Sequence, residues 1–142
     1  MKLFSLPAIF FFFIVCLSAL PACKNYGPHI NFQSDVVYYE SPVTKQQADS
    51  LGRFLKVYGY FQDKEYSVQL VNRGGYRFRM VLSDEALNQK ESLVPDAQQM
   101  ARDISVSVLG GEEIAVDFCD HKLRTVLAIP FVQDSAENEE SV

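Results

Sequence analysis

The sequence has few of the side chains on which most catalytic and metal sites depend: it contains two histidines and three cysteines. Cys119, Asp120 and His121 are consecutive, but neighbours on a strand point to opposite faces, so they do not converge on one ion. We therefore predict that Cys119 is a buried or half-buried strand residue and that His121 is a turn residue. No catalytic residue is assigned, and neither a metal nor another cofactor is expected.

Basic residues are also in the minority, with 13 Lys and Arg against 18 Asp and Glu and a net charge of −5. A nucleic-acid-binding surface needs a cationic stripe or patch, so we exclude nucleic acid as a partner. Several acidic residues fall in residues 133–142, namely Asp134, Glu137, Glu139 and Glu140, where there is no aromatic residue. Because this segment has little to bury, we predict a disordered acidic tail.

The start of the chain has a single charged residue, Lys2, and none from there to Cys23. Leu3 to Leu20 is almost wholly apolar and contains no Asp, Glu or Arg, although Pro7 interrupts it. A membrane-spanning helix needs ~20 apolar residues, and this stretch falls just short of that length. A positive start, a short apolar centre and small residues near its end are typical of a secretion signal.

The end of this leader, Leu20-Pro21-Ala22-Cys23, resembles the lipobox of bacterial lipoproteins. Leu20 lies three places before the cysteine and Ala22 lies directly before it, as in that family, whereas Pro21 departs from the usual small or hydroxylic residue. The resemblance covers residues 1–23. It implies that residues 1–22 are a cleaved signal peptide and that Cys23 carries the lipid, whose several acyl chains give stable anchoring.

The same resemblance implies a location. A lipidated Cys23 makes the protein membrane-anchored in the bacterial envelope and periplasm-facing. Enterobacterial lipoproteins that stay in the inner membrane have an aspartate after the cysteine, so Lys24 favours the outer membrane. Cys16 would leave with the leader, and Cys119 would then have no cysteine with which to form an intrachain disulfide.

Two other interpretations of the leader stay open. A simple secretion signal would be cut after Ala22 and would leave Cys23 as an ordinary thiol. An uncleaved leader would act as a membrane anchor.

After Cys23 we expect a short tether over residues 23–34, which is polar and contains Gly27 and Pro28. A single α+β domain is expected over residues 35–132. Alternation and β-branched or aromatic residues predict its strands, which are residues 35–40, 66–71, 76–82, 113–119 and 123–131. The glycines of residues 72–75 predict a hairpin turn between the second and third of these strands.

Two amphipathic helices complete the pattern. Thr44 and Gln47 have capping-box spacing before the first, and Pro95 suits the start of the second. Residues 83–94 are expected to form a loop or a short extra turn of helix. The resulting order, β-α-β-β-α-β-β, predicts a ferredoxin-like two-layer sandwich with one added strand. Its two helices would cover one face of a mainly antiparallel sheet.

The uncovered face of that sheet is the candidate binding surface. Arg77 and Arg79 alternate with apolar residues and should point to this face. Gln69, Asp117 and Tyr39 are expected beside them on neighbouring strands. Arginine pairs two oxygens at once and is common where anions or carboxylates are recognised. The plainer interpretation is cross-strand pairing of arginine with acidic residues on a solvated face.

We therefore expect a membrane-tethered, non-enzymatic module that binds an envelope protein or another envelope component through its open sheet face or an edge strand. The alternative is a small-ligand sensor or enzyme that uses Arg77 and Arg79, and this would need a concave pocket. A structural surface protein without a catalytic role is a third hypothesis.

Overall fold

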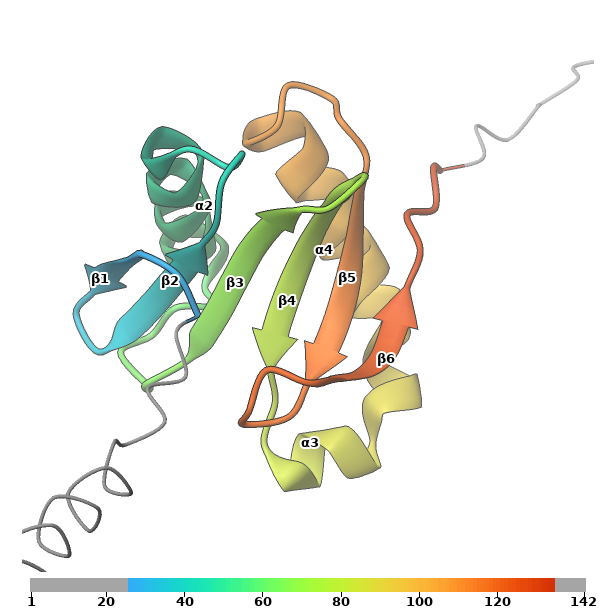
Figure 1. Ribbon diagram of the computed structural model, residues 1–142. Helices are drawn as coiled ribbons and strands as arrows, with labels where there is room; N and C mark the ends of the chain where they lie inside the picture. The colour runs from blue at the N-terminus through green and yellow to red at the C-terminus, as the bar shows by residue number, and fades with distance from the viewer. Residues whose placement is uncertain (1–25, 135–142) are drawn as a thin grey trace, which may run out of the picture.

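The structure is a computed structural model that describes residues 26–134, which form a six-stranded sheet with helices packed behind it (Figure 1). The strands are β1 (His29–Phe32), β2 (Asp35–Tyr39), β3 (Ser67–Asn72), β4 (Tyr76–Val81), β5 (Ile114–Cys119) and β6 (Thr125–Ile129). The helices are α2 (Lys45–Tyr58), α3 (Asp84–Asn88), the short 3-10 helix η2 (Lys90–Leu93) and α4 (Val94–Ser107).

The predicted signal peptide, the predicted lipidation site Cys23 and most of the predicted acidic tail lie outside the described residues. Within residues 26–134, no helix has the length and apolar character needed to cross a bilayer.

The strands follow one another across the sheet in chain order, from β1 to β6. The β2–β3 and β4–β5 pairs are parallel, while the other three neighbouring pairs are antiparallel. Parallel neighbours need a crossover connection, which α2 and α4 provide. The chain direction reverses between β3 and β4 while both helices cover the same face, so the two crossovers have opposite hands. One of them therefore departs from the usual right-handed rule.

The predicted ferredoxin-like order is wrong. That architecture would insert the strand at residues 76–82 between those at residues 35–40 and 66–71, whereas β2 pairs directly with β3. The sheet is mixed rather than mainly antiparallel. It also gains β1, because residues 29–32 of the predicted tether form a strand that pairs with β2. Of the two alternatives for residues 83–94, a loop or a short extra turn of helix, the structure contains the second, as α3 and η2.

The buried carboxylate of Asp35 explains why β2 and β3 are neighbours. It accepts hydrogen bonds from the backbone N–H groups of Asp63, Lys64 and Tyr66, at 2.8, 3.2 and 2.9 Å. In addition, the Val36 N–H donates to the carbonyl of Tyr66 at 2.9 Å. These bonds hold the start of β2 against the start of β3 and leave no space for a strand between them.

The core lies between the sheet and the two long helices. The predicted capping box is confirmed, since the Thr44 hydroxyl accepts from the Gln47 N–H and the Gln47 side chain accepts from the Thr44 N–H. One face of each helix packs on even-numbered residues of β3, β4 and β5, among them Val68, Leu70, Phe78, Met80, Ile114, Val116 and Phe118. The odd-numbered residues of these strands point to the opposite face, which we call the open face.

Candidate functional site

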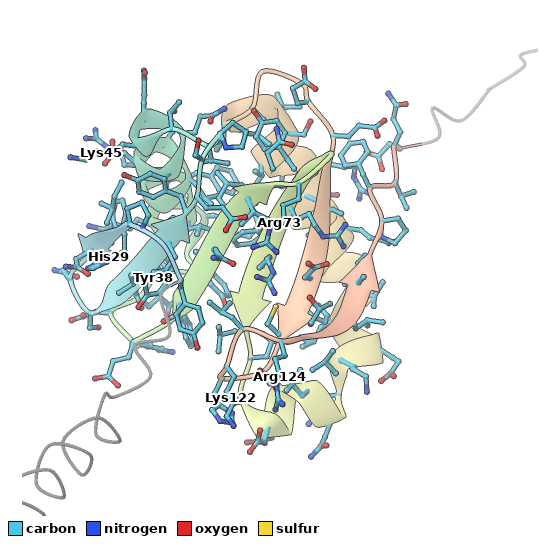
Figure 2. The ribbon with its side chains drawn as sticks, in the orientation of Figure 1. His29, Tyr38, Lys45, Arg73, Lys122 and Arg124 are labelled. Carbon is cyan, nitrogen blue, oxygen red and sulfur yellow. The ribbon has the colours of Figure 1, made fainter. Side chains whose placement is uncertain are left out.

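The open face brings together four of the five residues that the sequence predicted for a binding surface. Arg79 of β4 lies opposite Gln69 of β3 on one side and opposite Asp117 of β5 on the other. Arg77 is two positions before Arg79 and points to the same face. In Figure 2 this face of the sheet lies in front of the helices.

Asp117 is the centre of this group and is only 2% exposed. Its carboxylate accepts from the Arg77 guanidinium at both oxygens, with Nε–Oδ2 at 2.9 Å and Nη2–Oδ1 at 2.5 Å. Such a two-point pair is among the stronger charged hydrogen bonds in proteins. The Thr125 hydroxyl donates to Oδ2 at 3.4 Å, and Arg79 Nε lies 3.6 Å from the same oxygen. The carboxylate is therefore fully engaged by its neighbours.

The side chain of Arg79 is also enclosed, with 12% of its surface exposed. Its Nη1 donates to Gln69 Oε1 at 2.6 Å and its Nη2 donates to the Leu123 carbonyl at 2.6 Å. Gln69 in turn donates from Nε2 to the carbonyl of Tyr26 at 2.8 Å. The plainer interpretation is right about cross-strand pairing but not about a solvated face, because Asp117 and Gln69 are buried. The group joins four strands and the segment before β1 in one hydrogen-bonded network.

Tyr39, the fifth predicted residue, lies on the other face. It pairs with Leu70 and packs against the core, because β2 turns Val37 and Tyr39 toward the helices. Tyr38 takes the place expected for Tyr39 and pairs with Gln69 on the open face. Its ring contacts those of Tyr26 and His29, with centroid distances of 5.6 and 5.5 Å.

Tyr26 has no predicted role, because it belongs to the polar stretch for which the sequence predicts a tether. Its aromatic side chain in that polar stretch was the available signal. Leu123 and Thr125 were missed for another reason: a backbone carbonyl and a single hydroxyl have no distinctive sequence pattern.

The Cys119-Asp120-His121 run behaves as predicted for its first and last residues. Cys119 is buried, and burial raises the pKa of its thiol, which lowers its thiolate content and its reactivity. His121 is exposed in the turn. The backbone N–H of Arg124, followed by its side chain and the Lys122 N–H, lowers the pKa of Asp120 to about 2.

These contacts make Asp120 a turn-stabilising residue, and its contribution is lost as the pH falls from its ordinary pKa toward 2. Within residues 26–134, no cluster of His, Cys, Asp or Glu side chains is arranged to hold a metal ion.

Two hollows in the surface lie near the sheet, one on each side of it. A shallow one of about 330 Å³ on the open face is lined partly by Arg73 and Arg77, whose guanidinium groups already hold Glu40 and Asp117. A more apolar groove of about 430 Å³ lies on the helix side, between the end of α2 and the start of α4. Tyr58, Tyr60, Met80, Leu93, Asp96 and Met100 are among its lining residues.

The fold and the open face thus define a small α/β domain built on a six-stranded mixed sheet. Residues 29–130 match a family model described as the AF_1994_N family N-terminal domain, and the chain belongs to this family. The match begins at the first residue of β1 and ends one residue after β6. No curated protein and no solved structure matches the chain.

Proposed function

We propose that this chain is a bacterial lipoprotein, anchored in the envelope through lipid on Cys23, whose domain is a non-enzymatic module that binds an envelope protein. The observation that carries the anchoring is the position of Cys23 after Leu20 and Ala22 at the end of an apolar leader. Two or more acyl chains on one residue provide stable membrane attachment, whereas a single chain provides only marginal binding.

Replacement of the anchoring cysteine tests this part of the proposal. We expect the mature N-terminal peptide from a membrane fraction to begin at Cys23 and to carry the mass of the lipid. We expect Cys23→Ala to retain its leader, because the substituted chain lacks the thiol to which the diacylglyceryl group is attached. An unmodified Cys23 thiol in the mature protein would overturn the anchoring.

Strand addition at β6 is the binding mode that the fold favours. Among the described strands, β6 is the last in the sheet order and pairs only with β5. Its sequence, Thr125–Ile129, contains no charged residue and no proline, and Val126 is 46% exposed. Proteins usually protect such an edge with charges or proline. Arg124 and Pro130 flank the strand and its register with β5 shifts at Phe118/Cys119, so the part of the edge without charge or proline is Thr125–Ile129 alone. An edge of this kind can pair with an extended segment of another chain through backbone hydrogen bonds.

The alternative, a small-ligand sensor or enzyme at the arginines, has less support. Its anion would have to displace Asp117 from Arg77 and Gln69 from Arg79. Each of these exchanges would break a buried or partly buried bond that the fold already makes. We therefore keep the binding module as the proposed function.

A charge placed on the β6 edge tests the binding mode. We expect Val126→Lys to abolish crosslinking of the membrane-bound protein to its envelope partner, because a lysine on an edge strand opposes further pairing. The fold should tolerate the change, since an exposed substitution alters stability by about 0.5 kcal/mol or less.

Val57→Lys is the matched control, because Val57 is an almost fully exposed valine on α2. It should leave the crosslink unchanged. Loss of the crosslink in both variants, or in neither, would contradict strand addition at β6.

A further inference from the structure

The chain enters the domain on the open face and is fixed there. The Tyr26 carbonyl accepts from Gln69 of β3, and the Tyr39 N–H donates to the Pro28 carbonyl at 3.0 Å. Gly27 between them has φ +93°, and a Cβ at this position would lie 2.3 Å from the Tyr39 carbonyl oxygen. Only glycine fits this close approach, so the position at which the chain joins the sheet is fixed by specific backbone contacts.

Little chain separates this entry point from Cys23, which lies three positions before Tyr26. Because an extended chain spans at most ~3.6 Å per residue, the two Cα atoms lie within about 11 Å of each other. The helices α2 and α4 lie on the far side of the sheet and together add one layer about 10 Å thick. A chain this short is unable to pass around the domain and present the helix layer to the bilayer.

The side chains around the entry point suit a lipid headgroup region. The Tyr38 ring contacts the rings of both Tyr26 and His29, and we call these three residues the entry patch. Figure 2 shows His29 and Tyr38 together on β1 and β2, at one edge of the sheet. Tyrosine has an apolar ring and a polar tip, and it is enriched at membrane–water interfaces for that reason.

We propose that lipid on Cys23 holds the open face toward the bilayer, with the entry patch in contact with the headgroups. This inference rests on the proposed lipidation. In this orientation the two edges of the sheet have different roles. The β1–β2 edge lies at the membrane, while β6 at the opposite edge stays available to the envelope partner.

The absence of tryptophan from the sequence allows a direct test with single-tryptophan reporters. Tyr38→Trp places the reporter in the entry patch, and His29→Trp is a second reporter there should the first fail to fold. Val106→Trp is the control, because Val106 is a largely exposed residue of α4 on the helix side. The full lipidated protein is inserted into vesicles of phosphatidylethanolamine and phosphatidylglycerol, with or without bromine near the headgroup end of the acyl chains.

We expect brominated lipid to remove most of the fluorescence of the entry-patch reporter and to leave the Val106→Trp reporter unchanged. Equal quenching of the two positions, or quenching of Val106→Trp alone, would overturn the orientation while the anchoring still stands. Mass spectrometry and vesicle flotation of the same samples separate the two proposals. A protein without lipid that does not float with the vesicles would overturn the anchoring and the orientation together.

Discussion

Asp117→Ala is expected to lower the free energy of unfolding by about 3–5 kcal/mol, the usual consequence of removing one partner from a buried ion pair. The substitution takes both oxygens away from Arg77 and removes the negative charge that lies 3.6 Å from Arg79 Nε. Because the Arg79 side chain is almost enclosed, water is unable to replace the lost carboxylate fully. The positive charge of Arg79 then remains in the sheet with only neutral acceptors around it.

Urea denaturation followed by circular dichroism measures this effect, and Glu40→Ala is its control. Glu40 holds Arg73 in the same two-point manner, but the Arg73 side chain is 56% exposed and that of Glu40 is 33% exposed, against 3% for Asp117. An exposed pair contributes about 0–1 kcal/mol, so Glu40→Ala should have little effect. If the two variants lost the same small amount, Asp117 would not be structural, and the arginines would become candidates for an anion site.

Local signals in the sequence predicted most elements of this fold because they act over a few residues. The Thr44–Gln47 capping box, the turn of residues 72–75 and Pro95 each mark an element boundary that the structure contains. The alternation of Arg77, Phe78 and Arg79 likewise assigned these side chains to opposite faces correctly.

Strand order was not predictable in the same way. Alternation shows which face a residue occupies, but two different orders of strands satisfy the same alternation. The decisive contacts join Asp35 to the backbone of residues 63–66, and backbone N–H groups have no sequence signature. The strand β1 was missed because His29–Phe32 is only four residues long and follows Gly27 and Pro28.

In the candidate site, too, local patterns predicted part of the arrangement and long-range contacts decided the rest. Gln69, Arg77, Arg79 and Asp117 were assigned to the open face from periodicity alone, and the structure places them there. Tyr39 was misplaced because Val37 and Tyr39 alternate with Val36 and Tyr38, so both faces of β2 read as apolar or aromatic. The neighbouring strand decides between them, since Leu70 brings Tyr39 to the core side.

The contacts of Asp35 lead to the second large expected effect. Asp35→Ala should lower the free energy of unfolding by about 2–4 kcal/mol, because three backbone N–H groups lose their common acceptor. The carboxylate is 1% exposed, so its removal also leaves a buried space beside those donors. Two residues of the loop that it holds, Asp63 and Glu65, have φ values of 58° and 60°. Non-glycine residues adopt this conformation at a cost of roughly 1–2 kcal/mol each, and Asp35 helps to offset it.

Amide hydrogen exchange distinguishes this local role from a general loss of stability. The Asp63, Lys64 and Tyr66 amides should exchange much faster in Asp35→Ala than amides of α4, which are far from the substitution. Asp49→Ala is the control, since Asp49 pairs with Arg53 on the exposed side of α2 and should contribute about 0.5 kcal/mol or less. Unchanged protection of the three amides would mean that the loop of residues 63–66 keeps its conformation without Asp35. The parallel pairing of β2 with β3 would then need a cause other than Asp35.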